Sequence, residues 1–127
     1  YYDMHYPYWQ RLTVRLPTPM MLDLIFADFE KDDEVEALKA GDEILFFVNS
    51  LGSTTMMELL IALRKARQIL NGKGIKTYDV IVGPLVTCQE MSGISFSITQ
   101  LDDELKRLWD LPCQSVCYSK MEGHYGG

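Results

Sequence analysis

The stretch GDEILFFVNSLGSTTMMELL, residues 41–60, decides the fold of this chain. Its residues 44–48 are all apolar, which predicts a strand that is central in a sheet or covered on both faces. Thr55 is followed three residues later by Glu58, and this capping-box spacing predicts that a helix begins here. The junction between strand and helix, residues 49–55, is where nucleotide-binding folds hold a phosphate. The loop is therefore either a binding loop or a turn that caps the helix.

The loop of residues 49–55 contains one glycine and no lysine, so it matches neither a Walker A loop nor the three-glycine dinucleotide fingerprint. The amides at the start of the following helix could still hold an anion. Asn49 has a structural alternative, because asparagine side chains bond turn amides. The pattern favours a capping turn and leaves an anion site open.

Upstream of this stretch, residues 11–16 alternate between polar and apolar side chains, which predicts a half-buried strand. Thr18 before Pro19 predicts the start of a helix, with the threonine as its N-cap. Four apolar residues then fall on one helical face: Leu22, Ile25, Phe26 and Phe29.

Downstream, a helix from Thr55 is predicted to end at Asn71 and Gly72. Its expected inward residues are Met56, Leu59, Leu60, Leu63 and Leu70. Strands are predicted at residues 77–82 and 94–98, the second with one polar face. A helix over residues 102–110 has Leu105, Leu108 and Trp109 as its expected inward residues, and a short strand is predicted at residues 115–118.

This order of elements predicts an α+β fold, a two-layer sandwich in which a mixed sheet has helices packed on one side. The length of 127 residues and the 47% apolar content suit a single core. We expect an aromatic N-terminal segment at residues 1–10, an α/β domain at 11–118 and a flexible tail at 119–127.

The charge balance argues against nucleic acid as a partner. The net charge is -6, and residues 28–36 hold six carboxylates against Lys31 alone. No apolar stretch approaches the roughly 20 residues that span a bilayer, and no export signal is recognisable, so we expect no membrane partner. Three cysteines in a chain of this size fit reduced thiols and a cytoplasmic location.

Few residues are candidates for chemistry. His5 is the only plausible nucleophile or base, although no serine or carboxylate is tied to it by local sequence. Cys113, Cys117 and His124 lack a fourth zinc ligand and a finger spacing, so no metal site is predicted. Nothing basic adjoins Cys88 to lower its pKa, which favours an inert thiol.

Several motifs in order resemble the C-terminal part of the dihydroxyacetone-binding subunit of dihydroxyacetone kinases. They are GDEILFFVNSLGSTTMMEL, LNGKGI, VGPLVTCQEMSGISFSITQLDDEL and LWDLP. In the first family motif, V-N-N-L-G runs into S/T-x-x-E-L, and the matching residues are Val48, Asn49, Leu51, Gly52, Glu58 and Leu59. The second is matched by Val82, Gly83, Thr87, Met91, Gly93 and Ser95, with residues 101–105 after it. The resemblance covers about residues 15–112.

The resemblance implies phosphorylation of dihydroxyacetone, which the family holds on a histidine as a hemiaminal. The phosphoryl group comes from ATP on a separate nucleotide-binding subunit or from a phosphotransferase relay, so no cofactor is expected on this chain. The family histidine lies in G-I-H-G-E-P-G. His5 occupies a similar place before RLPT, without the glycines and the glutamate, and is the candidate catalytic residue; the substrate-binding residues stay unknown.

Two alternatives follow from the resemblance. The chain is either the C-terminal domain of a kinase subunit, acting with an N-terminal domain that it lacks, or a non-catalytic regulatory or assembly module with the same fold. In both cases we expect the isolated chain not to turn over dihydroxyacetone with ATP. We also expect a homo-oligomer, or binding to the complementary domain, through residues 1–10 and the polar-faced strand.

Overall fold

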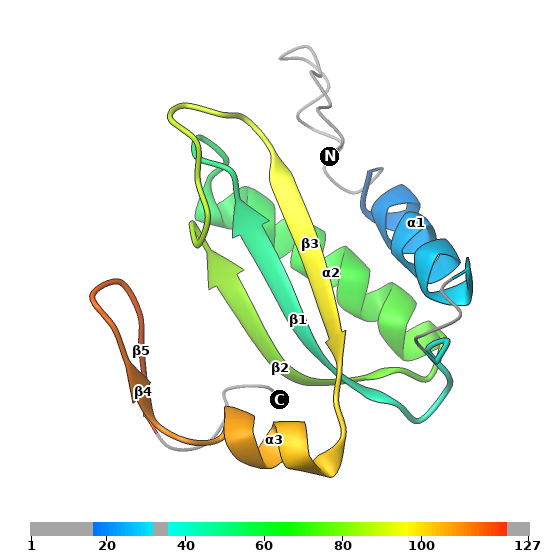
Figure 1. Cartoon of the computed structure of the whole chain (residues 1–127). Coiled ribbons are helices and arrows are strands. Elements are labelled where there is room, and N and C mark those ends of the chain that lie inside the picture. The colour runs from blue at the N-terminus through cyan, green and yellow to red at the C-terminus, as the bar shows by residue number, and fades with distance from the viewer. Residues whose placement is uncertain (1–16, 32–35, 122–127) are drawn as a thin grey trace.

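The computed structural model describes residues 17–31 and 36–121. In this part of the chain the main sheet has three strands in the order β2-β1-β3 (Figure 1). The central strand β1 (Glu43–Ser50) pairs in parallel with β2 (Lys76–Gly83) and antiparallel with β3 (Ile94–Gln100). The helix α2 (Met56–Gly72) connects β1 to β2. The predicted mixed sheet and the central place of the apolar strand are therefore confirmed.

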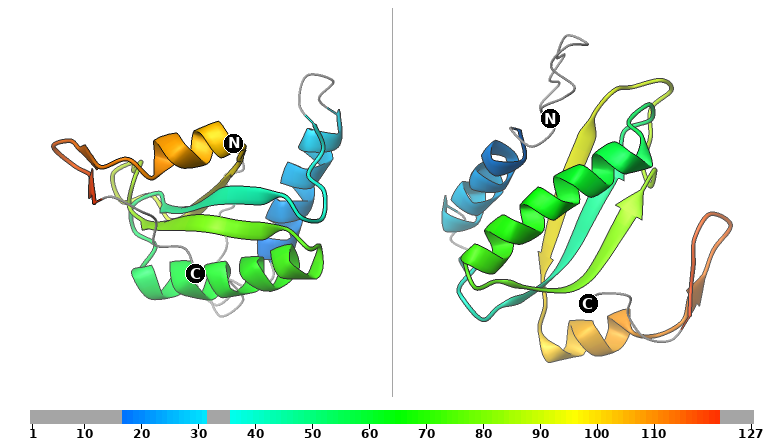
Figure 2. Two further views of the ribbon diagram at one scale, coloured as in Figure 1. Left: turned by 90° about the horizontal axis from the view of Figure 1, so that it is seen from below. Right: turned by 180° about the vertical axis from the view of Figure 1, so that it is seen from behind.

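The two long helices share one core with one face of this sheet. Leu22 of α1 (Pro17–Lys31) and Leu59 of α2 are buried with Phe46 of β1. The short helix α3 (Asp103–Trp109) lies on the opposite side of the sheet from α2 (Figure 2), where the Trp109 ring meets Phe47 edge to face. The two-layer α+β sandwich is confirmed, with α3 added beside the other face.

The start of α1 and the C-terminal cap of α2 differ slightly from the prediction. Because α1 begins at Pro17, Thr18 lies in its first turn and is buried instead of preceding the helix as its N-cap. At the C-terminal end of α2, the residue with positive φ is Gly74, two positions after the predicted Gly72. Its N–H donates to the Asn71 carbonyl, and the Ile75 N–H donates to the Leu70 carbonyl, which forms a Schellman motif.

Four residues expected inside are exposed. Met56 and Leu60 of α2, and Leu105 and Leu108 of α3, are each about half exposed. Helical spacing identifies an apolar stripe but not what covers it. Trp109, the last residue of α3, contacts Phe47 and Asp79 of the sheet. The two leucines of α3 are instead about half exposed.

The predicted strand at residues 115–118 is wrong. Those residues form the turn of a hairpin between β4 (Cys113–Gln114) and β5 (Ser119–Lys120). Ser115 closes the turn, because its N–H donates to the Tyr118 carbonyl and its Oγ accepts from the Tyr118 N–H. The strand β5 takes the first two residues of the expected tail.

Other expectations concern residues outside the described ranges. They are the aromatic segment 1–10, the strand at 11–16 and residues 122–127. None of the helices between residues 17 and 121 that the structure describes is both long enough and apolar enough to cross a bilayer.

Candidate functional site

Two loops meet at the carboxyl ends of the parallel strands β1 and β2 (Figure 1). We call residues 50–55 and 84–93 the paired loops. Their backbones are bonded three times: the Leu51 N–H donates to the Gly93 carbonyl at 3.0 Å, the Ser53 N–H to Met91 at 2.9 Å and the Cys88 N–H to Leu51 at 2.7 Å. The loop that joins β1 to α2 is therefore packed against a loop from the second sequence motif.

Asn49, the next-to-last residue of β1, anchors the second loop. Its side chain is only 7% exposed, and Oδ1 accepts from the N–H groups of Leu85 at 2.8 Å and Val86 at 2.9 Å. Nδ2 donates to the Val86 carbonyl at 2.9 Å and to Ser95 Oγ at 3.0 Å. Both donors and both acceptor sites of the amide are thus used. Asn49 binds backbone amides of a turn, as expected, but these amides belong to the loop after β2 and not to the turn that follows Asn49.

Gly52 and Thr54 permit and complete the contact. A Cβ on Gly52 would lie 2.4 Å from the Cys88 carbonyl oxygen, so the loops could not approach as they do with any other residue there. Thr54 Oγ1 donates to the Gly93 carbonyl at 2.8 Å and accepts from its N–H at 3.0 Å. The paired loops form one bonded unit.

Several amides of this loop and of the first turn of α2 already have protein partners. Thr55 Oγ1 accepts from the Glu58 N–H, and the Glu58 carboxylate accepts from the Thr55 N–H at 2.9 Å, so the predicted capping box is confirmed. A carboxylate thus already occupies this end of α2. The N–H groups of Leu51, Gly52 and Ser53 likewise donate to oxygen atoms of the protein. The geometry favours the capping turn over a phosphate site.

A second polar cluster holds α3 to the sheet. The Trp109 indole N–H donates to the buried Asp79 carboxylate at 2.8 Å, and the Tyr78 hydroxyl donates to Asp110 at 2.6 Å. The buried Lys120 ammonium lies 4.2 Å from the Trp109 ring centroid and donates to the Trp109 carbonyl. Bonding to Asp110 raises the pKa of Tyr78, so the phenol stays protonated as a donor. Sequence spacing could not reveal this cluster, because its members come from separate elements.

An ion pair completes the attachment of α3. The Lys106 ammonium lies 2.5 Å from the Glu43 carboxylate at the start of β1 and 3.2 Å from Asp103. The hydrogen bond to Glu43, and to a smaller extent the one to Asp103, raises the pKa of Lys106.

The candidate chemical residues are not brought together by the described structure. His5 and His124 lie outside the described ranges. Cys88, Cys113 and Cys117 are exposed free thiols. Within residues 17–31 and 36–121, no three histidine, cysteine or acidic side chains converge to hold a metal ion.

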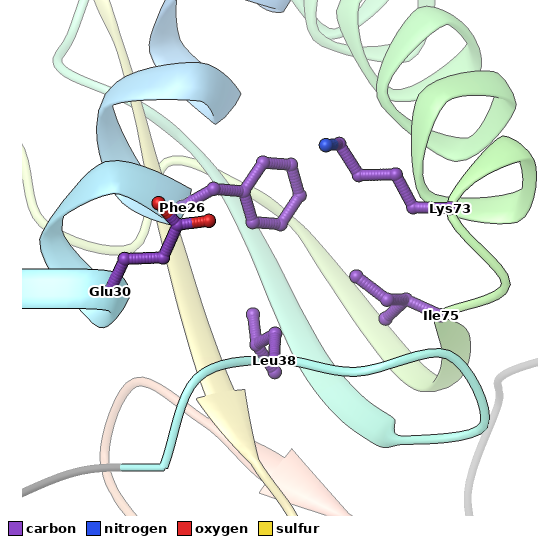
Figure 3. A pocket seen from close by; sticks show the side chains of 5 residues that line it. All are labelled: Phe26, Glu30, Leu38, Lys73 and Ile75. Atoms are coloured by element: carbon purple, nitrogen blue, oxygen red, sulfur yellow. The ribbon is translucent and has the colours of Figure 1, made fainter.

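A small pocket opens where α1 meets the C-terminal end of α2 (Figure 3). It measures about 230 Å³ and is lined by Phe26, Glu30, Leu38, Lys73 and Ile75. The Lys73 ammonium lies 4.6 Å from the Phe26 ring centroid. The pocket is smaller than the roughly 300–1,000 Å³ typical of ligand sites. It lies at the other end of α2 from the paired loops, and the sequence motifs do not include its residues from α1.

The chain matches the model of the Dak1 domain over residues 11–117. It belongs to the Dak1 domain family. The predicted resemblance to dihydroxyacetone kinase subunits is therefore confirmed, and two of the four stretches that carry it, residues 41–59 and 82–105, include the paired loops.

The chain is also similar to longer proteins of known activity. The chain is 38% identical over 78 residues to the dihydroxyacetone-binding subunit DhaK of PTS-dependent dihydroxyacetone kinase 2 from Listeria innocua, covering 61% of this chain and 24% of that protein. It is 33% identical over 81 residues to the L-erythrulose kinase of Pectobacterium atrosepticum, covering 64% and 14%. The chain thus spans about a quarter or less of the length of these relatives.

A solved structure shares the fold. Its title is "Regulation of the dha operon of Lactococcus lactis", and it aligns with a TM-score of 0.72 and 24% identity over 84% of this chain and 32% of that chain. At this identity the likeness supports the fold alone.

Proposed function

We propose that this chain is the C-terminal domain of a dihydroxyacetone kinase substrate-binding subunit. It acts in the phosphorylation of dihydroxyacetone together with an N-terminal domain and a separate phosphoryl donor, which is either ATP on a nucleotide-binding subunit or a phosphotransferase protein. The observation that carries the proposal is the paired loops. Both family motifs contribute to them, and Asn49, Gly52 and Thr54 join them into one bonded unit.

The position of the paired loops suits a substrate site. In open α/β sheets, ligands bind outside the carboxyl ends of the strands, where these loops lie. The Ser53 and Ser92 hydroxyls face each other across the loops at 2.8 Å and are exposed. Hydroxyl groups of this kind can bond the hydroxyls of a small sugar, so we assign the loops the role of completing a substrate site.

The covalent step is assigned to His5. An imidazole nitrogen adds to the C2 carbonyl carbon of dihydroxyacetone, the carbonyl oxygen gains a proton and the imidazole loses one. No group leaves, so the hemiaminal has the summed mass of its two components. The support is the place of His5 before RLPT in the sequence.

Intact mass spectrometry of the full chain tests this assignment. After incubation with dihydroxyacetone, the chain is expected to gain the mass of one substrate molecule. His5→Ala is expected to abolish the gain, and His124→Ala, which alters the other histidine, is the matched control. A gain that survives His5→Ala would remove His5 from the mechanism.

A regulatory or assembly module is the second candidate function. The residues around His5, Asp3 to Pro7, lack the glycines and the glutamate of the family motif. This alternative predicts that the chain lacks the adduct and adds no turnover when joined to the rest of a kinase subunit.

A further inference from the structure

The outer side of α2 carries an apolar patch over its first two turns. We call Met56, Met57, Leu60 and Ile61 the α2 patch; their exposed fractions are 48%, 70%, 50% and 36%. The opposite side of the same turns packs on the sheet, where Leu59 and Ala62 are each 1% exposed.

The composition of these turns indicates a second covering layer. Every residue from 56 to 63 except Glu58 is apolar. A helix that is apolar all round is built to be buried all round. The sheet buries one side of α2, so the other side lacks a comparable cover among the described residues.

The α2 patch is bounded and firmly held. One and two turns beyond it, the same outer side carries Arg64 and Gln68, both exposed. The capping box at Thr55 and Glu58 holds its N-terminal end. Exposed apolar patches with a polar rim mark interaction sites.

We infer that the α2 patch is the surface on which the remainder of a dihydroxyacetone-binding subunit packs, through an apolar surface of its own. This inference rests on the proposed function. The Listeria innocua subunit contains enough further chain to supply such a surface, because the matched stretch is only 24% of its length.

The size of the α2 patch favours that occupant over a second copy of this chain. Stable association of separate proteins uses about 20–30 residues a side, far more than four. Two surfaces joined in one polypeptide need a smaller contact, because the linkage supplies an effective concentration of about millimolar. A small apolar contact therefore suits packing within one subunit.

Methionine oxidation tests the inference without mutation. The probe is a chimera in which this chain replaces the matched stretch of the Listeria innocua subunit, compared with the isolated 127-residue chain. Because sulfoxide formation requires exposure, Met57 should oxidise about tenfold more slowly in the chimera. Met121, which is 76% exposed on the chain outside α2, is the internal control.

The outcomes separate this inference from the proposed function. If the chimera binds dihydroxyacetone while Met57 oxidises as fast as in the isolated chain, the α2 inference is overturned and the proposed function stands. If Met57 is protected but no dihydroxyacetone binds, the proposed function fails instead. Protection of Met57 in the isolated chain that grows with concentration would identify a second copy as the occupant and overturn the inference.

A chimera that does not fold is covered by a second measurement. In the unaltered Listeria innocua subunit, hydroxyl-radical labelling of the helix that corresponds to α2 should be low on its outer side. Strong labelling there would overturn the inference.

Discussion

Asn49 binds Val86, 37 residues further along the chain, through both ends of its side-chain amide. Nδ2 donates to the Val86 carbonyl at 2.9 Å, and Oδ1 accepts from the Val86 N–H at 2.9 Å. One buried residue at the end of the central strand therefore determines where the second motif loop lies. The Val86 side chain is exposed, so the backbone groups of Val86 make these bonds to Asn49.

Replacing Asn49 should cost more than replacing an exposed asparagine. Asn49→Ala removes four hydrogen bonds, and because water can reach part of the loop, we expect a loss of about 2–3 kcal/mol in the free energy of unfolding. Urea unfolding measures this loss. Asn71→Ala, at an exposed position of α2, is the control and should change stability by less than about 0.5 kcal/mol. Equal effects at both positions would contradict the role given to Asn49.

Two glycines should respond in opposite directions to alanine. Gly52→Ala places a methyl group 2.4 Å from the Cys88 carbonyl oxygen, so the paired loops must separate and the melting temperature should fall. Gly72→Ala, the last residue of α2, meets nothing within 4 Å. It should stabilise the chain by about 0.5–1 kcal/mol, because alanine restricts the unfolded chain more than glycine does. Thermal unfolding of both variants would show whether loop contact depends on Gly52.

The attachment of α3 should weaken in alkali. Folding raises the pKa of Tyr78 above 10.0 and that of Lys106 above 10.5, through their bonds to Asp110 and Glu43. The native state then binds more protons than the unfolded state in the range above about pH 10, so stability falls as pH rises through the folded pKa values. Below that range the contribution is fully present.

Two variants test this pH dependence. Tyr78→Phe and Glu43→Gln should each give a shallower fall of the melting temperature with rising pH. The matched control is Glu36→Gln, because Glu36 pairs with Lys39 on an exposed surface. If the control flattens the alkaline slope as much as Glu43→Gln does, the ion pair at Lys106 is not its cause.

The indole of Trp109 should matter beyond its apolar surface. Trp109→Phe retains a ring beside Phe47 but removes the donor to the buried Asp79 carboxylate. Since a hydrogen bond to a charged group contributes about 1.5–3 kcal/mol, a loss in that range is expected in urea unfolding. Leu108→Ala, on the exposed side of α3, should cost far less. A larger loss at Leu108 would mean that α3 packs through its leucines, as the sequence pattern predicted.

The sequence predicted the parts of the fold that depend on neighbouring residues. The apolar run of β1 and the capping box at Thr55 and Glu58 are local, and both are confirmed. The bond between Asn49 and Val86 is not local, so the loop could be identified as a turn but not assigned its partner. Helical spacing likewise placed Leu60 and Leu105 on apolar stripes, but it could not show that each is about half exposed in the structure. The turn at residues 115–118 was missed because Ser115 Oγ closes it against the backbone, a contact that alternation does not signal.

The most direct test of the central claim is a kinase assay on the chimera of this chain with the Listeria innocua subunit. With the phosphoryl donor system of that subunit present, the chimera is expected to phosphorylate dihydroxyacetone, and Asn49→Ala in the chimera should lower the rate. The isolated chain is expected to show no turnover under the same conditions. A folded chimera without activity would contradict the assignment to a catalytic subunit, and sustained turnover by the isolated chain would contradict the proposal that it works only with further domains.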